Sequence, residues 1–385
     1  MISANGEVDL HNQLQSAGLE LVQFSVVQSK KNNFTLGGGG VKNRDLIQLF
    51  THLNQMQEAG VPLLDALGDI RDSTENDSLR DIMSEIYRDV SEGNSLSESM
   101  GNHPKVFTNL YLSLISAGEE TGDLSMSYRQ LVKYVKWLDE MQTKIKKATR
   151  YPLILLIVVA VTVYVMMAVV VPQIVGFLDN MEQELPFYTT ALQATSAFFV
   201  SYGIYVFIVP IVLIIALKFA RKSSEDFKYK TDYFILSLPI AGNLIRKINI
   251  ARYSQTFAAL FASGIHVVGC LEASRNTVSN LALVEAMDSV ISQVKAGASM
   301  SEAFNASGEF PSLVVRMVKI GEESGGLTDV LNQVSDFYSK DVNEAVEGMI
   351  TMIEPMLTAI LGVMILWIAA GVFGPIYGMI GDLDI

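Results

Sequence analysis

Three stretches of the chain lack charged residues over a length that can cross a lipid bilayer, for which an α-helix needs about 20 residues. They run from Tyr151 to Leu178, within Leu185 to Leu217, and from Pro355 to Gly381. A buried helix of this length in a soluble protein normally keeps a polar stripe, and these stretches show none. The sequence therefore predicts three membrane spans, at residues 151–178 (span 1), 197–217 (span 2) and 355–381 (span 3).

The charges that flank the spans predict their direction, because cytoplasmic loops are enriched in Lys and Arg. No Lys or Arg occurs from Tyr151 to Leu217, and the tail after span 3 carries only two aspartates. Residues 1–150 and 218–354 are therefore expected in the cytoplasm, and the 179–196 loop and the C-terminus in the periplasm. In the alternative interpretation, the basic residues that flank the spans form a surface that binds a partner. The basic residues concerned are Lys144, Lys146, Lys147 and Arg150 before span 1, and Lys218, Arg221 and Lys222 after span 2.

The composition agrees with a membrane protein, since half of the residues are hydrophobic and the mean hydropathy is +0.31. The formal net charge of −13 argues against nucleic acid as a partner, which would require a basic face. The polar start, Met1 to Gln13, lacks the apolar core of a signal peptide and is expected to stay in the cytoplasm. The sole cysteine, Cys270, lies in an apolar stretch and is expected to be a small buried side chain.

Two parts of the sequence repeat each other at a separation of 203 to 204 residues. Four landmarks recur in the same order, which requires one single-residue deletion between the copies and is not expected by chance. The landmarks are Ala59-Gly60-Val61 and Ser263-Gly264-Ile265; the segments 93–100 and 297–304; the segments 118–124 and 321–327; and the pairs Pro152/Pro172 and Pro355/Pro375.

Each landmark predicts a helix boundary. Ser95 and Ser299 are followed by glutamate at the spacing of a capping box, which marks the start of a helix. Gly60 and Gly264 follow amphipathic stretches, as a glycine does where a helix ends. No segment alternates with strand periodicity for long enough to predict a sheet. We therefore expect about six short helices in each copy, the last of which continues into the membrane.

The predicted fold is an all-α membrane protein with two tandem cytoplasmic helical bundles and three transmembrane helices. Span 2 has no counterpart in the repeat, because a second copy in the same orientation must begin in the cytoplasm and needs one return crossing. The predicted divisions are a short N-terminal segment with a Gly-rich linker (1–43), the first bundle (44–150), span 1 (151–178), a periplasmic loop (179–196), span 2 (197–217), a basic cytoplasmic connector (218–247), the second bundle (248–354) and span 3 (355–381).

A Gly-Glu-Glu-Thr/Ser-Gly box occurs once in each copy and is predicted to form a tight turn between two helices. In the structural interpretation, which we favour, one glutamate bonds the backbone of the turn and the other faces water. In the functional interpretation, the pair offers an acidic surface to a partner or a cation. The box comprises Gly118, Glu119, Glu120, Thr121 and Gly122 in the first copy, and Gly321, Glu322, Glu323, Ser324 and Gly325 in the second.

The residues give no support for enzymatic chemistry. The segment from Gly37 to Asn43 lacks the Lys-Ser/Thr end of a phosphate-binding loop, no G-x-S-x-G occurs, and no ionisable residue lies inside a span. The four histidines are isolated, so no metal-ligand spacing exists. We expect no catalytic residue, no cofactor and no metal. The histidines are His11, His52, His103 and His266.

With the two copies aligned, the chain resembles the inner-membrane platform proteins of type II secretion systems and type IV pili, the general secretion pathway protein F family. The resemblance covers about residues 44–381 and depends on the paired landmarks, including the Tyr-Pro and Glu-Pro steps that begin spans 1 and 3. Two features differ. The N-terminal region is shorter than in many members, and His103-Pro104 stands where the second copy has Phe310-Pro311.

The resemblance implies a non-enzymatic scaffold in the bacterial inner membrane. Such a platform is expected to bind a hexameric cytoplasmic assembly ATPase, pilin or pseudopilin transmembrane helices, other inner-membrane assembly proteins, lipid and further copies of itself. It would couple the ATPase to polymerisation of pilin subunits. The alternative is a transporter with parallel internal repeats, but that class normally carries polar groups at the membrane midplane, and these spans are plain.

Overall fold

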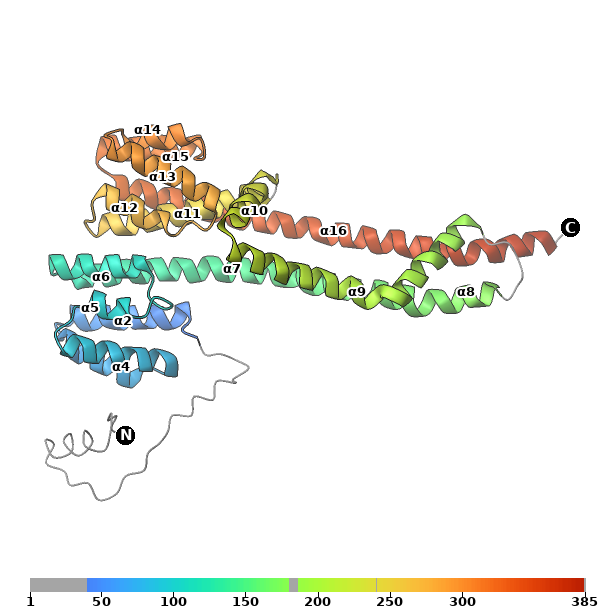
Figure 1. Ribbon diagram of the computed structural model, residues 1–385, viewed down its shortest axis with the longest axis horizontal. Helices are drawn as coiled ribbons and strands as arrows, with labels where there is room; N and C mark the ends of the chain where they lie inside the picture. The colour runs from blue at the N-terminus through green and yellow to red at the C-terminus, as the bar shows by residue number, and fades with distance from the viewer. Residues whose placement is uncertain (1–39, 180–185, 240, 384–385) are drawn as a thin grey trace, which may run out of the picture. The chain divides into compact units, whose positions relative to one another are not determined.

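The computed structural model describes residues 40–179, 186–239 and 241–383, and every regular element in them is a helix (Figure 1). The expected all-α class is confirmed. Residues 1–39 of the predicted N-terminal segment (1–43) and residues 180–185 of the predicted loop (179–196) lie outside the described residues. The first copy contains α2 (Asn43–Glu58), α3 (Leu63–Ser73), α4 (Asp77–Ser91), α5 (Leu96–Gly101), α6 (Asn109–Thr121) and α7 (Leu124–Val165).

The second copy repeats these six helices in the same order. Between the copies, α7 continues through a π-helical turn (Met166–Val170) into α8 (Val171–Asp179), and α9 (Phe187–Ser223) and α10 (Glu225–Ser237) follow. The second copy contains α11 (Ala241–Ala262), α12 (Val267–Arg275), α13 (Leu281–Lys295), α14 (Met300–Ser307), α15 (Ser312–Ser324) and α16 (Leu327–Leu383).

Each bundle forms because its helices have one apolar face. In α2 the buried residues Leu46, Leu49, Phe50 and Leu53 follow the spacing of a single helix stripe and pack against α7. The helix ends before Gly60, whose φ of 76° is left-handed and favours glycine. The same construction in the second copy joins α11 to α16, so both bundles are assembled around the long helix that leads to the membrane.

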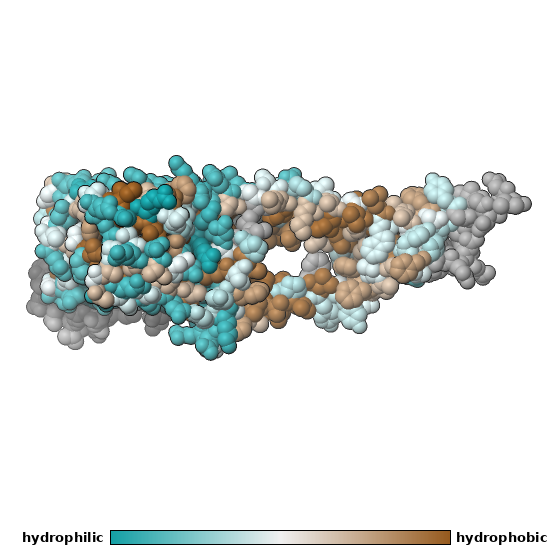
Figure 2. Space-filling model, turned by 90° about the horizontal axis from the view of Figure 1, so that it is seen from above, coloured by the Kyte–Doolittle hydropathy of each residue, from teal (hydrophilic) through white to brown (hydrophobic). Residues whose placement is uncertain are grey.

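Three of these helices are assigned to the membrane. The helix through α7 to Gly176 and the helix α16 are each long and apolar enough to cross a bilayer, and α9 qualifies if its two halves, bent by 55°, form one span. The pair α10 and α11 also passes by composition but bends by 107°. We exclude that pair because α11 carries Arg246, Lys247 and Arg252 and is buried over much of its length in the second bundle. In Figure 2 hydrophobic side chains cover the helices that leave the bundles, whereas the bundles are mainly hydrophilic.

The π-helical turn in the first span is explained by Pro172. The amide of Val171 bonds the carbonyl of Met166, five residues back, and proline has no amide to bond the next carbonyl, that of Met167. The hydroxyl of Ser196 on α9 donates to this carbonyl at 2.7 Å. A carbonyl without a partner is costly in hydrocarbon, so this bond fixes α9 against the first span.

Close glycine contacts fix α9 against α16 as well. A side chain at Gly371 would place its Cβ 2.7 Å from Leu192 Cδ2, and one at Gly374 would overlap the ring of Tyr188. The hydroxyl of Thr189 donates to the carbonyl of Gly371 at 2.9 Å. Small residues that admit a neighbouring helix, together with polar bonds across the contact, are typical of helix packing in membranes.

We predict that Ser196→Ala lowers the free energy of unfolding by about 1 kcal/mol, because it leaves the Met167 carbonyl without its donor. The measurement is thermal unfolding of the purified chain in detergent. The matched control is Ser201→Ala at an exposed position of the same helix. Equal stability of the two variants would show that the Met167 carbonyl is satisfied in another way.

Candidate functional site

The short helices α5 and α14 each begin at a serine of the predicted Ser-x-x-Glu box. Ser95 Oγ accepts a hydrogen bond from the Glu98 amide at 3.1 Å, and Ser299 Oγ accepts one from the Glu302 amide at 3.2 Å. In the second copy the Glu302 carboxylate also accepts from the Ser299 amide at 3.3 Å, which completes a capping box. Each serine therefore satisfies one amide that the first helical turn leaves without a partner.

The first glutamate of each Gly-Glu-Glu box bonds two further amides of the same short helix. Glu119 accepts from the Leu96 amide at 2.6 Å and the Ser97 amide at 3.3 Å, with one carboxylate oxygen for each. Glu322 accepts in the same way from the Met300 amide at 2.5 Å and the next amide at 2.9 Å. These bonds are charge-assisted, and they place a negative charge at the positive end of a helix. Both copies thus join α6 to α5, and α15 to α14, through a carboxylate.

The first glycine of the box admits the next helix. A side chain at Gly118 would place its Cβ 2.5 Å from Ser127 Oγ and 3.1 Å from Leu124 Cα. At Gly321 the added Cβ would lie 3.1 Å from Leu327 Cα. Because backbone atoms cannot yield as a flexible side chain does, both positions favour glycine. The close approach also brings the following long helix, α7 or α16, against the end of α6 or α15.

The box forms the last turn of a helix, and only its end is a connection between helices. The helices α6 and α15 continue through Thr121 and Ser324, and the glycines that follow, Gly122 and Gly325, have φ values of 78° and 74°. The tight turn expected over the whole box is therefore confined to its final glycine. Glu119 consequently bonds the start of a different helix, because a residue within the last turn of α6 projects sideways onto α5.

The second glutamate of each box faces solvent. Glu120 and Glu323 are exposed, and their contacts are weak: Ser116 Oγ lies 3.4 Å from Glu120, and Lys319 Nζ lies 3.9 Å from Glu323. Surface pairs of this kind contribute at most about 1 kcal/mol. Of the two acidic positions, only this one accepts no backbone amide from a neighbouring helix, although Glu322 is exposed as well.

The basic residues that flank the spans lie in the middle of α7, where it leaves the first bundle, and at the C-terminal end of α9. Most of them are exposed, but Arg221 pairs with Asp232 of α10, which is 3 % exposed. Asp232 also accepts from the Leu281 amide at 3.0 Å, and its own carbonyl accepts from Asn280 Nδ2 at 3.1 Å. One buried carboxylate therefore connects the end of span 2 to the start of α13. Sequence inspection missed it, because Asp232 lies in a segment that appeared to be only a basic connector.

The remaining titratable groups form no centre for chemistry in the described part of the chain. His52 lies 3.2 Å from Asp69 and His103 lies 3.4 Å from Glu85, each as a single surface pair. Among the described residues no group of three or more His, Cys, Asp or Glu side chains could hold a metal ion. Cys270 is buried, and burial raises the pKa of its thiol to about 12.

These features define a duplicated, all-helical membrane scaffold whose repeated polar element serves its own packing. Comparison with known proteins agrees with this class. The family described as type II secretion system (T2SS), protein F matches residues 49–172 and 253–375, which together make up more than half of the chain. The two matched segments correspond to the two copies of the repeat.

Individual relatives are similar over nearly the whole chain. The type IV pilus assembly protein TapC of Aeromonas hydrophila is 31% identical, over 92% of this chain and 86% of its own. The type IV pilus assembly protein PilC of Pseudomonas aeruginosa is 31% identical, over 94% and 98%. The type II secretion system protein F of Vibrio cholerae is 27% identical, over 93% and 87%.

The chain belongs to the type II secretion system protein F family, which includes the PilC proteins of type IV pili. It is a non-enzymatic platform protein of the inner membrane. This family membership decides against the alternative interpretation as a transporter. The resemblance stated from the sequence is confirmed, as are the expected class of function and the internal repeat.

We predict that Glu119→Gln, and equally Glu322→Gln, lowers the free energy of unfolding by about 1–2 kcal/mol, the typical cost of losing a helix cap. The amide keeps one acceptor oxygen but turns its NH₂ group toward a backbone N–H and carries no charge. Thermal unfolding of the purified full chain measures the effect. Glu120→Gln, a change of the same size at the neighbouring exposed carboxylate, should stay within about 0.5 kcal/mol of the parent. Equal losses for both residues would contradict the assigned cap.

Proposed function

We propose that this platform protein serves type IV pilus assembly, with bundles that bind a hexameric cytoplasmic assembly ATPase and spans that contact pilin transmembrane helices. Three pilus assembly proteins are 31–32% identical and a fourth is 27% identical, against 26–28% for the secretion proteins, which favours a pilus over a secretion system. Other inner-membrane assembly proteins, lipid and further copies of the chain complete the proposed partners. The same contacts with a pseudopilin would serve secretion.

The proposed orientation has both bundles in the cytoplasm and the C-terminus in the periplasm. It is supported by the two clusters of basic residues, which lie where α7 enters and α9 leaves the apolar region. The structure adds that α7 and α16 both start in a bundle and extend into an apolar part without a break in the helix. Both copies therefore have the same direction relative to the membrane.

The observation that carries the proposal is this continuity between bundle and span. The helix α7 runs for 42 residues and α16 for 57, so a displacement of either bundle is transmitted along a stiff helix into the membrane. The two helices are tied together outside the apolar region: Trp137 Nε1 donates to Ser339 Oγ at 3.0 Å, and Lys133 Nζ donates to Asn332 Oδ1 at 2.9 Å. A motor that moves the bundles would therefore move the spans as a pair.

We predict that a flexible insertion in both long helices abolishes pilus assembly while a helical insertion of equal length retains part of it. Seven residues are inserted after Lys147 and after Ile350, either as alanines or as a Gly-Ser sequence. Seven alanines add nearly two turns with a phase change of about 20°, so the connection remains stiff. Surface pili are counted in cells, and membrane accumulation is measured in parallel.

Deletion of the gene sets the baseline for this experiment and should leave no pili and no defect in solute uptake. Equal piliation with the two insertions would overturn the mechanical coupling. Normal piliation after gene deletion would overturn the assigned pilus function itself.

We also predict that the acidic positions of the two boxes separate into a partner-facing and a structural class. Glu120→Lys combined with Glu323→Lys should reduce pilus assembly while the protein accumulates normally, because both carboxylates are exposed. Glu119→Lys combined with Glu322→Lys should reduce accumulation, because it puts a positive charge on the start of two helices. Normal assembly in the first double variant would exclude the exposed glutamates as partner contacts.

A further inference from the structure

The two bundles pack against each other through different faces, although they are copies of one module. The first bundle uses α6 and α7, which we call the α6–α7 face, and the second uses α11 and α12, the α11–α12 face, together with the side of α16 that carries Asn332 and Ser339 and contacts α7. In Figure 1 the α11–α12 face lies over α6 and α7, with α4 and α14 on opposite outer sides. A groove of about 470 Å³ along the contact is lined by Asn109 and Tyr134 from the first bundle and by Arg252 and Asn276 from the second.

In the part of the chain that the structure describes, the counterpart of the α6–α7 face in the second bundle is uncovered. Tyr134 is 5 % exposed and lies against Thr256 and Arg252 of α11. Burial raises the pKa of its phenol, whereas the neighbouring Thr256 hydroxyl and the charge of Arg252 lower it. Its counterpart, Phe337, is 45 % exposed. Likewise Leu110 is 3 % exposed, whereas its counterpart Leu313 is 37 % exposed. The α15–α16 face therefore presents apolar side chains at the positions that form the contact in the first bundle.

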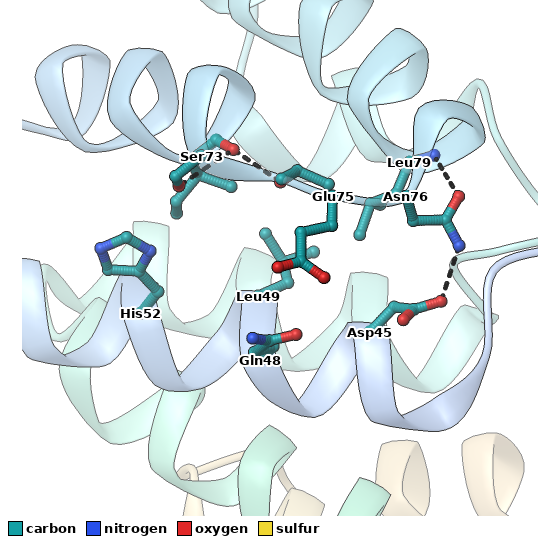
Figure 3. A pocket seen from close by; sticks show the side chains of 10 residues that line it. Asp45, Gln48, Leu49, His52, Ser73, Glu75, Asn76 and Leu79 are labelled. Atoms are coloured by element: carbon teal, nitrogen blue, oxygen red, sulfur yellow. Dashed lines mark hydrogen bonds between the residues drawn. The ribbon is translucent and has the colours of Figure 1, made fainter.

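Among the described residues, nothing covers the counterpart of the α11–α12 face either. In the first bundle this is the α2–α3 face, where Gln48 stands for Arg252, Asp72 for Asn276 and Ser73 for Thr277. Figure 3 shows the open pocket on this face, with Gln48, His52 and Glu75 directed into it between α2 and the start of α4. Its volume is about 130 Å³.

The two uncovered faces are complementary in charge. On the α2–α3 face, Asp69, Asp72 and Glu75 are exposed; Asp69 lies 3.2 Å from His52, Asp72 pairs with Arg71, and Glu75 has no basic partner among the described ion pairs. On the α15–α16 face, Arg316 and Lys340 are exposed, as is Asp336, and helical spacing places Arg316 one turn beyond Leu313. Lys319 is exposed further round the helix, where it lies 3.9 Å from Glu323. Each of these two faces is the counterpart of a face that already forms the contact between the bundles. The acidic face of one chain is therefore suited to bind the basic face of a second copy.

We propose that the α15–α16 face of one chain binds the α2–α3 face of a second copy, and so repeats between chains the contact that joins the two bundles within a chain. This contact is heterologous, since each chain offers two different faces. Because both copies of the module have the same direction relative to the membrane, repetition proceeds sideways along the membrane and forms a ring where the rotation closes. The inference builds on the proposed self-association and adds the surfaces that mediate it.

The test uses cysteine cross-linking of the full chain in native membranes with a short bis-maleimide. Asn109 and Asn276 lie across the intramolecular groove, and their exposed counterparts are Ser312 and Asp72. Ser312→Cys combined with Asp72→Cys should give cross-linked dimers and larger multimers. Asn109→Cys combined with Asn276→Cys should react within one chain and confirm the geometry. The parent chain, whose single Cys270 is buried, is the control without reaction.

The single variants decide the mode of association. Differently tagged chains carrying only Ser312→Cys or only Asp72→Cys should give mixed dimers and no larger product when co-expressed, and little product alone. A self-linked Ser312→Cys dimer would indicate a twofold contact and overturn the proposal. So would a cross-link from Asp72→Cys to a different protein or to the start of its own chain. The control pair Asp72→Cys with Ser292→Cys, exposed on α13, should not react.

A second variant tests the apolar part of the contact. Phe337→Asp should reduce the intermolecular product about tenfold, as expected when an aromatic residue near the centre of an interface is removed. Phe337→Leu should retain it. Co-purification of two differently tagged chains measures self-association separately. If the tags co-purify but the Ser312 and Asp72 positions do not cross-link, self-association stands and the proposed surfaces are wrong.

Discussion

A backbone that crosses hydrocarbon must satisfy its peptide groups within a helix, and the architecture of this protein follows from that constraint. The two long helices α7 and α16 leave their bundles as intact helices because an interruption in the bilayer would expose unpaired groups. Where Pro172 removes one amide, the helix widens and Ser196 of the neighbouring span supplies the missing donor. The requirement that makes α7 and α16 continuous therefore also makes them stiff, and connects the first and third spans mechanically to the bundles outside the membrane.

Duplication shows which parts of the module its fold requires. Both copies keep a glycine where two helices touch, a glutamate that caps the neighbouring short helix, and a glycine with left-handed φ at the end of the box. Each element satisfies backbone groups or admits a backbone, so substitutions there act on stability first. The surfaces have diverged instead: Tyr134 and Phe337 occupy equivalent positions, yet one is buried between the bundles and the other is exposed. The polar elements that both copies share thus lie inside the module, and the differences between the copies lie on their surfaces.

The sequence predicted the spans, the repeat and the helix starts at Ser95 and Ser299, because hydrophobic length, self-similarity and capping spacing are local signals. It also suggested that one glutamate of each box bonds the backbone. It could not identify that backbone, because Leu96 and Glu119 are separated by more than twenty residues and meet only after α5 and α6 fold together. The same holds for Asp232, whose partners Arg221 and Leu281 lie in different helices. The π-helical turn is a further case, since a proline in a membrane helix permits either a kink or a widened turn.

Joining two copies of a module in one chain fixes one contact between them and leaves one copy of each contacting face without a partner. The equivalent helices α7 and α16 contact each other directly, but the rest of the contact packs α6 and α7 against α11 and α12, so it is not twofold throughout and leaves the counterparts of these surfaces free. Phe337 at 45 % exposure and Leu313 at 37 % are apolar side chains of the α15–α16 face that a second surface would remove from water. The opposite charges of the two free faces favour contact between the α15–α16 face of one chain and the α2–α3 face of another, because like charges repel and opposite charges attract. In a parallel duplication of this kind, the contact between the two copies within a chain is therefore also the contact that would join successive chains along the membrane.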